Sequence, residues 1–229
     1  LDLFEMLCGA RITVSYMRPG GVTQDAPPEF WENLNDLLNK LPQLIDDLEN
    51  LITDNEIVIA RTKNIGILSP QKAIDSSVTG PILRASGINW DIRKANPYEV
   101  YDKMDFNIPT ESNGDCYDRY LVRIKEIRES INIVKQCIKS IPKGAIKNPE
   151  TPFFLRPECG EVYSSIESPR GELGFYLVSD GGIAPYRCKI RSPSFINLTV
   201  LRPLLIGWKM SDLVVIFGSL AVNMGEVDR

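Results

Sequence analysis

Four charged side chains recur at helical spacing between residues 113 and 141, and they are the first candidates for chemistry in this sequence. Asp115, Arg119, Arg123 and Glu126 fall on one side of a helix, opposite its apolar side chains. On spacing alone we favour a solvated face, in which residues three or four positions apart form ion pairs. The alternative is an ion-pair network buried inside an assembly.

Cysteine and histidine content restricts the other chemistry. The chain has 5 cysteines without a close pair and no histidine. An odd, scattered set suits reduced thiols better than a disulfide framework. Without a Cys-x-x-Cys pair or a histidine, the sequence argues against zinc, haem or iron–sulfur ligation by this chain alone. The usual general base is also missing, so we expect no catalysis by the isolated chain.

A tight bend is predicted at residues 17–22, which read Met-Arg-Pro-Gly-Gly-Val. Proline fixes one backbone dihedral, and the two glycines permit conformations that other residues resist. Such a bend lets the backbone approach a ligand or a neighbouring subunit closely, although Pro-Gly-Gly is more often only a turn. Arg18 beside it is a candidate for holding a polar headgroup or a charged neighbour.

A third group of candidates lies in residues 79–109, where glycines and prolines preclude a long regular element. Several aromatic residues make this stretch too apolar for an ordinary surface loop, so we expect it to be packed. Buried irregular backbone needs hydrogen-bond partners. Arg84, Asp91 and Arg93 are the natural suppliers.

The apolar pattern predicts two long helices that position these side chains. One covers residues 113–141 and ends before Pro142. The other covers residues 28–52, with a kink or a break expected at Pro42. Its aromatic and leucine side chains indicate core packing rather than a cofactor site.

Shorter elements follow. Two short helices are predicted between residues 57 and 75, separated by a turn at Gly66, the second beginning at Pro70 behind a Ser69 cap. Two more helices are predicted between residues 197 and 218.

The fold class indicated is α+β, a mainly helical body with a small antiparallel sheet near the C-terminal third. Alternating residues and intervening turns predict three strands, at 161–167, 172–179 and 186–191. Along the chain we expect a helical body at 1–144, a linker at 145–160, the antiparallel sheet at 161–191, and C-terminal helices with a tail at 192–229.

Composition excludes several classes of protein. The 229 residues suffice for one sizeable domain or two small ones. A net charge of -4 and a pI near 5.1 argue against a general nucleic-acid binder. The longest apolar run, residues 213–222, is about half of what a bilayer crossing requires.

Five segments, in this order along the chain, resemble successive blocks of one protein family. They read GARITVSYMRPGGV, TGPILRASGINWDIRKANPYEVYD, GDCYDRYLVRIKEIRESINIVKQ, ESPRGELGFYLVSDGGIAPYRCKIRSPSFINL and MGEVDR. The family is the large quinone-site subunit of respiratory complex I, or NAD(P)H-quinone oxidoreductase. Its members are called the D-type subunit in bacteria, the H-type subunit in cyanobacteria and plastids, and the 49-kilodalton-type subunit in mitochondria. The resemblance is to its C-terminal portion.

The resemblance implies part of an NADH-, NAD(P)H- or ferredoxin-quinone oxidoreductase that helps form the quinone-reduction pocket in the peripheral arm and couples electron transfer to proton translocation. Quinone is then the substrate, electrons arrive from an iron–sulfur cluster in a neighbouring small subunit, and NAD binds elsewhere in the complex. The implied partners are that small subunit, other peripheral-arm subunits and membrane-arm subunits. The implied location is peripheral, on the inner side of a bacterial cytoplasmic, mitochondrial inner or thylakoid membrane.

The family is also similar in fold to the large subunit of nickel–iron hydrogenases. The paired cysteines that hold nickel there have no counterpart in this sequence. Hydrogenase activity is therefore the reading that the resemblance supports least.

The sequence departs from the family pattern in three places. The N-terminal portion, with the His and Tyr that hold the quinone headgroup, is missing. We expect a segment of a longer polypeptide, with a processed or differently numbered chain as the alternative. Between Gly144 and Gly160 the usual helical, His-containing insert is absent, so the linker is shortened. Ser219-Leu220-Ala221 stands where the family typically has an acidic third residue. These departures leave a second hypothesis open, a diverged structural remnant that keeps the fold and interfaces without quinone chemistry.

By resemblance, two segments lie around the quinone cavity and the facing cluster-bearing subunit. They are Arg18, Pro19, Gly20 and Gly21 in the bend, and Ala221, Val222, Asn223 and Met224 near the C-terminus. No residue receives a catalytic or metal-binding role. The other charged candidates are interpreted as structural or interface charges, with proton coupling as the alternative: Arg84, Asp91, Arg93, Asp115, Asp118, Arg119, Arg123, Asp228 and Arg229.

Overall fold

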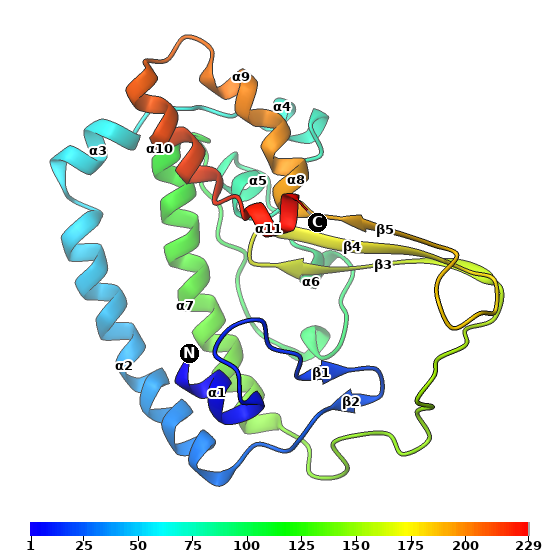
Figure 1. Cartoon of the computed structure of the whole chain (residues 1–229). Helices are drawn as coiled ribbons and strands as arrows, with labels where there is room; N and C mark the ends of the chain where they lie inside the picture. The colour runs from blue at the N-terminus through cyan, green and yellow to red at the C-terminus, as the bar shows by residue number, and fades with distance from the viewer. Residues whose placement is uncertain (229) are drawn as a thin grey trace. The chain divides into compact units, whose positions relative to one another are not determined.

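The computed structural model describes residues 1–228, and Figure 1 shows its elements. The helices are α1 (Asp2–Cys8), α2 (Pro28–Ile52), α3 (Glu56–Thr62), α4 (Pro70–Asp75), α5 (Pro81–Ala85), α6 (Ile92–Ala95), α7 (Cys116–Ser140), α8 (Pro193–Asn197), α9 (Leu201–Leu205), α10 (Met210–Leu220) and α11 (Met224–Val227), with 3-10 turns η1 (Tyr101–Lys103) and η2 (Leu198–Val200). The strands are β1 (Met17–Arg18), β2 (Gly21–Val22), β3 (Gly160–Ser168), β4 (Gly171–Ser179) and β5 (Arg187–Arg191). Helices with small antiparallel sheets confirm the expected α+β class.

The chain divides into two compact units. Unit 1 consists of Leu1–Leu48 and Val134–Leu155. Unit 2 consists of Glu49–Ile133 and Arg156–Arg229. Among the helices of residues 1–228, none combines the length and the hydropathy that a membrane span requires.

Both predicted long helices are present, as α2 and α7, but the break expected at Pro42 is absent. α2 is helical without interruption from Pro28 to Ile52, with Pro42 inside it. Phe30, Leu38 and Ile45 are buried along one side of α2, and apolar burial of this kind offsets the roughly 3 kcal/mol that an internal proline costs. Core packing is thus confirmed for these side chains, whereas Leu44 is 57% exposed.

The Pro-Gly-Gly segment of unit 1 is a short antiparallel hairpin. β1 pairs with β2 in a register that places Met17 opposite Val22 and Arg18 opposite Gly21. Gly20 and Gly21 both have positive φ, at 87° and 146°, which explains why glycine occupies the turn. Gly21 also makes an antiparallel bridge to Lys147, so the hairpin is paired with the segment that follows α7.

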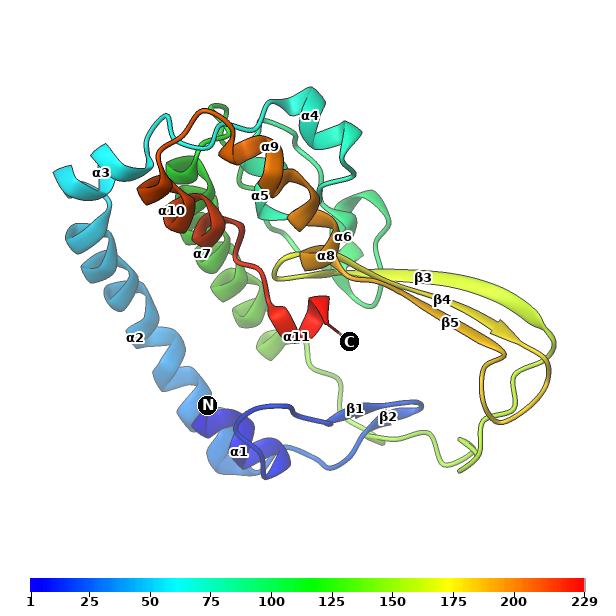
Figure 2. The ribbon, with the colours of Figure 1, turned by 45° about the horizontal axis from the view of Figure 1, so that its top comes forward.

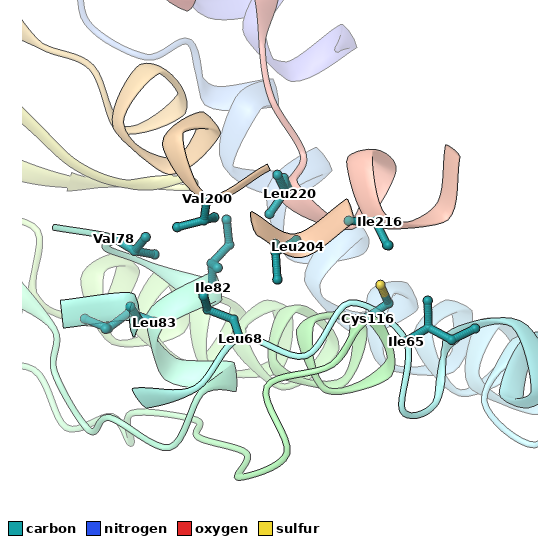
Figure 3. Close-up of a cluster of buried hydrophobic side chains, with 11 residues drawn as sticks. Ile65, Leu68, Val78, Ile82, Leu83, Cys116, Val200, Leu204, Ile216 and Leu220 are labelled. Atoms are coloured by element: carbon teal, nitrogen blue, oxygen red, sulfur yellow. The ribbon is translucent and has the colours of Figure 1, made fainter. Parts of the chain in front are cut away.

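The core of unit 2 forms where several helices converge, and Figure 3 shows its side chains. Ile216 of α10 and Cys116 of α7 both lie against Gly66, where an added Cβ would be 2.9 Å from Ile216 and 3.3 Å from the Cys116 sulfur. The predicted turn at Gly66 is therefore also a packing site. The other members come from α4, α5, η2, α9, α10 and nearby turns: Ile65, Leu68, Ala73, Val78, Ile82, Leu83, Val200, Leu204 and Leu220.

The three predicted strands form one sheet with the order β3-β4-β5, antiparallel throughout. Figure 2 shows these strands running together as a ribbon away from α8. The β3–β4 turn returns beside the start of α5, a contact that only glycines permit. A Cβ on Gly80 would lie 2.6 Å from the Arg170 carbonyl oxygen, and one on Gly171 would lie 2.5 Å from Thr79 Oγ1.

The short helix α4 begins where the sequence predicts. The Ser69 hydroxyl accepts from the Lys72 N–H at the start of α4, as the Ser-Pro pair predicts. Within residues 79–109 no helix exceeds five residues, and Phe106 is only 1% exposed, so the expected packing of this irregular stretch is confirmed there. The C-terminal part divides into more pieces than the two helices predicted: α8, η2, α9, α10 and α11.

Candidate functional site

The charged side of α7 is buried within unit 2, so the favoured solvated face was wrong. Asp115 and Arg119 are 0% exposed and Asp118 is 2% exposed. Asp115 caps the helix by accepting from the Asp118 N–H at 2.8 Å, and its other oxygen accepts from the Asn64 N–H at 2.7 Å. Asp118 in turn accepts from the Asn113 N–H at 2.7 Å. These carboxylates join α7 to two preceding turns.

Arg119 is a buried cation held mainly by neutral oxygens. Its Nη2 donates to the carbonyls of Gly66 at 2.6 Å and Gly114 at 2.8 Å, and its Nη1 donates to Ser219 Oγ at 2.9 Å. Burial lowers the pKa of Arg119, and the nearby Cys116 and Asp115 only partly oppose this. The side chain therefore connects α7 to the end of α10.

Two further arginines point at the same end of α10. Arg123 Nη2 donates to the Ser219 carbonyl at 2.7 Å, and Arg170 Nε donates to the Ala221 carbonyl at 2.7 Å. Carbonyls at a helix C-terminus carry partial negative charge, which favours cations there. Burial lowers the pKa of Arg123 to about 10. Arg119, Arg123 and Arg170 together form what we call the α10 arginine cap.

A second buried cluster of charges is centred on Arg84 of α5. Arg84 Nε donates to Glu126 Oε1 at 2.7 Å, and Arg84 Nη1 lies 3.0 Å from Glu167 Oε1 and 3.4 Å from Asp91 Oδ2. Arg84 is 2% exposed. Arg84 Nη1 also donates to the Trp90 carbonyl at 3.2 Å, so the prediction that Arg84 supplies partners for irregular backbone is confirmed.

Arg93 completes this Arg84 cluster from α6. Arg93 Nε and Nη2 donate to the two oxygens of Asp91 at 3.0 and 2.6 Å, a bidentate pair. The Arg93 guanidinium also lies over the rings of Phe106 at 4.9 Å and Tyr101 at 5.7 Å. Packing and pairing thus fix the position of Asp91 beside Arg84.

The carboxyl groups of the Arg84 cluster differ in pKa. Burial raises the pKa of Asp91, but hydrogen bonds from Arg93 and the charge of Arg84 outweigh it, so the pKa lies below its usual value. For Glu126 and Glu167 burial prevails over the attraction of Arg84, and both pKa values are raised. For Arg84 the charges of Glu126 and its neighbours outweigh burial and raise the pKa.

A cavity of about 430 Å³ opens beside the Arg84 cluster. Its walls come from α5, α6, η1, α7 and the end of β3: Arg84, Arg93, Tyr101, Arg123, Glu126, Ile127, Ser130, Glu167, Ser168 and Pro169. A second cavity, of about 470 Å³, lies between the sheet and α8, beside Tyr163, Tyr176 and Phe195. Among residues 1–228, no group of His, Cys, Asp and Glu side chains is placed to hold a metal ion.

The C-terminal candidates lie just beyond the α10 arginine cap. Ala221 is in the left-handed conformation with φ 51°, Val222 packs against the unit 2 core, and Met224 is 61% exposed. Asn223 caps α11 by accepting from the Gly225 N–H at 3.1 Å. Asp228 is exposed, and Arg229 lies outside the described residues.

Glu226 holds this C-terminal segment in place through hydrogen bonds. Its Oε1 accepts from the Ser192 hydroxyl at 2.8 Å and its Oε2 accepts from the Ser194 hydroxyl at 2.6 Å. Burial would raise the pKa of Glu226, but the hydrogen bonds from Ser194 and Ser192 prevail and lower it. The segment is thus held against the start of α8.

The bend candidates belong to unit 1 and meet the chain's own backbone. A Cβ on Gly20 would lie 2.1 Å from Thr151 Oγ1, and one on Gly21 would lie 2.3 Å from the Ile146 carbonyl oxygen. The Arg18 side chain is exposed and its Nε donates to the Ser15 carbonyl at 3.4 Å. The close approach that these glycines permit is therefore an approach to residues 146–151.

Sequence reasoning missed Glu167 and Arg170 as site residues. Both lie in the Glu-Ser-Pro-Arg-Gly run at the β3–β4 turn, and only the tertiary contact with α5 brings Glu167 to Arg84. No local signal marks either residue, because their partners Arg84 and Ala221 lie 83 and 51 positions away in the sequence. Glu126 was noticed on the charged side of α7 but was not selected as a site residue.

Known proteins match this chain along its whole length. Residues 1–159 and 151–229 match the family described as the respiratory-chain NADH dehydrogenase 49 kDa subunit. The D-type subunit of an NADH-quinone oxidoreductase from Dehalococcoides mccartyi is 53% identical over 229 residues, covering 100% of this chain and 62% of that protein. A D-type subunit from a Roseiflexus species is 52% identical, with 100% and 63% covered, and the one from a Wolbachia species is 42% identical, with 100% and 65% covered. The chain thus spans a little under two thirds of the length of these relatives.

Proposed function

The chain belongs to the 49 kDa subunit family of the respiratory-chain NADH dehydrogenase, and from this membership we propose that it forms part of a quinone-reducing subunit. In that role it contributes to the quinone pocket in the peripheral arm of an NADH-quinone oxidoreductase and couples electron transfer to proton translocation. The observation that carries the proposal is the match along the entire chain, at 42 to 53% identity to the D-type subunits of the three bacteria above.

We propose that quinone is the substrate and that its electrons come from an iron–sulfur cluster of a neighbouring small subunit, with NAD bound elsewhere in the complex. Quinone needs apolar walls and a few placed polar groups. The segment Ala221–Met224 offers both kinds of surface, since Met224 is exposed and apolar while Asn223 is exposed and polar. We propose that Arg18 and the β1–β2 hairpin also contribute to the quinone pocket.

Exposed apolar side chains support stable partners for unit 2. Met210, Val214 and Phe217 follow one another at helical spacing on α10 and are 82, 70 and 38% exposed. Large exposed apolar surfaces mark interaction sites on soluble proteins. We propose that this side of α10 contacts the cluster-bearing small subunit or a membrane-arm subunit, and that the chain is peripheral on the inner side of an energy-transducing membrane.

The finer fold proposal is a likeness to the large subunit of nickel–iron hydrogenases. Its support is the order of elements, a long helix followed by a three-stranded antiparallel sheet and C-terminal helices. Superposition on an experimental hydrogenase large subunit tests this likeness. Failure of α7, β3–β5 and α10 to superpose together would refute it.

Native isolation is the experiment that tests the function. The assembly is extracted gently with detergent, separated under native conditions, and every chain that migrates with this one is identified by mass spectrometry. Recovery of a cluster-bearing small subunit and membrane subunits, together with quinone reduction by that fraction, is the expected result. Recovery alone, or only with unrelated proteins, would contradict the proposal and favour a structural remnant.

Single variants then test the two proposed segments. Arg18→Gln should depress quinone reduction more than assembly, whereas Arg11→Gln, which changes an exposed arginine of the same unit paired with Asp2, should not. Loss of assembly with normal specific activity would instead show that Arg18 has only a structural role. Ala221→Asp should alter quinone affinity or turnover, and Ala221→Asn, which adds the same shape without a charge, is its matched control.

A further inference from the structure

In the Arg84 cluster, three carboxylates are hydrogen-bonded to two arginines. Arg93 donates to both oxygens of Asp91, so this carboxylate has a guanidinium of its own. Arg84 is then the partner shared by Glu126 and Glu167, whose Oε1 atoms lie 2.6 and 3.0 Å from its nitrogens. Two buried carboxylates therefore share one cation, and like charges at one site disfavour ionisation of both.

Glu167 has a carboxylate oxygen without a partner. Its side chain is 3% exposed, and Oε2 is buried with no hydrogen bond among the described residues. The main-chain N–H of Glu167 donates to the Tyr98 hydroxyl at 3.0 Å, so that hydroxyl is turned to the backbone. An unpaired anionic oxygen in such a position is costly, and a protonated carboxyl group costs far less.

None of the described charged groups on the surrounding elements donates a hydrogen bond to Glu167 Oε2. Arg123 of α7 uses its Nη atoms on the carbonyls of Arg119 and Ser219. Arg170, in the β3–β4 turn, donates to the Ala221 carbonyl. The Tyr101 ring of η1 lines the cavity, and the Arg93 guanidinium lies over it. Arg123 attracts Glu126 through space without a hydrogen bond to it.

We propose that the 430 Å³ cavity is a proton-binding site in which Glu126 and Glu167 together hold one proton at neutral pH. The proton comes from a hydronium ion or a water-borne acid in the cavity, which is left as water or as the conjugate base. It forms an O–H bond on a carboxylate oxygen, and Glu167 Oε2 is the atom that lacks any other partner. The proposal rests on the geometry of unit 2 and not on the proposed quinone chemistry.

Burial acts in the same direction as this geometry. It raises the pKa of both Glu126 and Glu167, and Arg84 does not fully compensate. Because both carboxylates contact the guanidinium of Arg84, protonation of one changes the charge balance at the other, and we assign the proton to the pair. Glu126 is the more accessible member, with its side chain 18% exposed. It is therefore the entry point from the cavity.

Infrared difference spectroscopy on the native assembly tests the site. At neutral pH the unmodified assembly should show a carboxylic-acid carbonyl band, shifted in D2O, that Glu167→Gln removes, a loss of about one acid group per chain. Glu126→Gln should remove or shift the same band. Glu161→Gln, at an exposed glutamate of the same strand whose partner is Tyr176, should leave it unchanged.

Identical carbonyl regions in the unmodified assembly and in both variants would overturn the proposal, because both carboxylates would then be ionised. If Glu167→Gln prevents assembly, Glu126→Gln and the disappearance of the band on raising the pH still decide the question. Quinone reduction measured on the same samples reports separately on the proposed function. If quinone reduction is absent while the carboxylic-acid band is normal, the proposed function is rejected and the proton site remains.

Discussion

The Nη2 atom of Arg123 lies 2.7 Å from the carbonyl oxygen of Ser219, so the first half of α7 is hydrogen-bonded to the last turn of α10. A guanidinium at this place satisfies a carbonyl that no helical N–H can reach. It also opposes the partial negative charge of the helix end. This hydrogen bond thus holds the backbone from which residues Ala221–Met224 continue.

Arg123→Gln should lower the free energy of unfolding by about 2 kcal/mol, because a charged hydrogen bond to a poorly hydrated carbonyl is lost. Urea denaturation of the purified chain measures this change. Lys125→Gln removes a cation from the same helix whose partner is the surface residue Glu111, and should cost less than about 1 kcal/mol. Equal losses in the two variants would show that Arg123 has no special role at the end of α10.

Ala221→Gly should stabilise the chain by about 0.5 kcal/mol. Ala221 has φ 51°, and the left-handed conformation costs a side-chain-bearing residue more than the added flexibility of glycine does. Ala95→Gly is the matched control, since this exposed residue ends the short helix α6 and should lose about 0.5 to 1 kcal/mol. Urea denaturation should give opposite signs, and a loss of stability in both variants would contradict the prediction.

Gly21→Ala should loosen the packing of the hairpin in unit 1. An added Cβ would lie 2.3 Å from the Ile146 carbonyl oxygen, and the backbone has φ 146°. We expect faster hydrogen exchange at the Val22 N–H, which donates to that carbonyl at 3.0 Å. Gly144→Ala separates clash from strain, because Gly144 has φ 144° with nothing within 4 Å of an added Cβ. Similar effects in both variants would show that the backbone conformation alone decides.

Local sequence patterns were enough to predict most elements. The period of apolar residues located α2 and α7, and alternation with glycine turns located β3, β4 and β5 to within a residue or so. These signals are local, since they depend on neighbours in the chain. Pro42 shows their limit. Its effect on α2 depends on burial of the helix face, which the local pattern does not fix.

The candidate site was harder to predict because its partners are distant in the sequence. Arg119 was assigned to a solvated side of α7, yet it is buried because Gly66, Gly114 and Ser219 surround it with oxygens. Spacing within a helix carries no information on which side meets the core when both sides contain large residues. Glu167 reaches Arg84 only through the contact of Gly80 with the β3–β4 turn.

Asp91 and Glu167 should give opposite pH dependences of stability. The pKa of Asp91 is lowered on folding, so its stabilising contribution is present above its unfolded pKa and is lost as the pH falls through the folded value. The pKa of Glu167 is raised, so its contribution is present below its unfolded pKa and is lost as the pH rises through the folded value.

Urea denaturation over a series of pH values, from acidic to neutral, measures both effects. Asp91→Asn should cost about 3 kcal/mol at neutral pH, since Arg93 and Arg84 lose a buried partner, and this deficit should shrink as the solution becomes more acidic. Glu167→Gln should show the opposite trend. Its free energy of unfolding should rise relative to that of the unmodified chain as the pH goes from acidic to neutral. Parallel curves for the two variants would mean that the Arg84 cluster holds all three carboxylates in the same charge state, with no proton bound between Glu126 and Glu167.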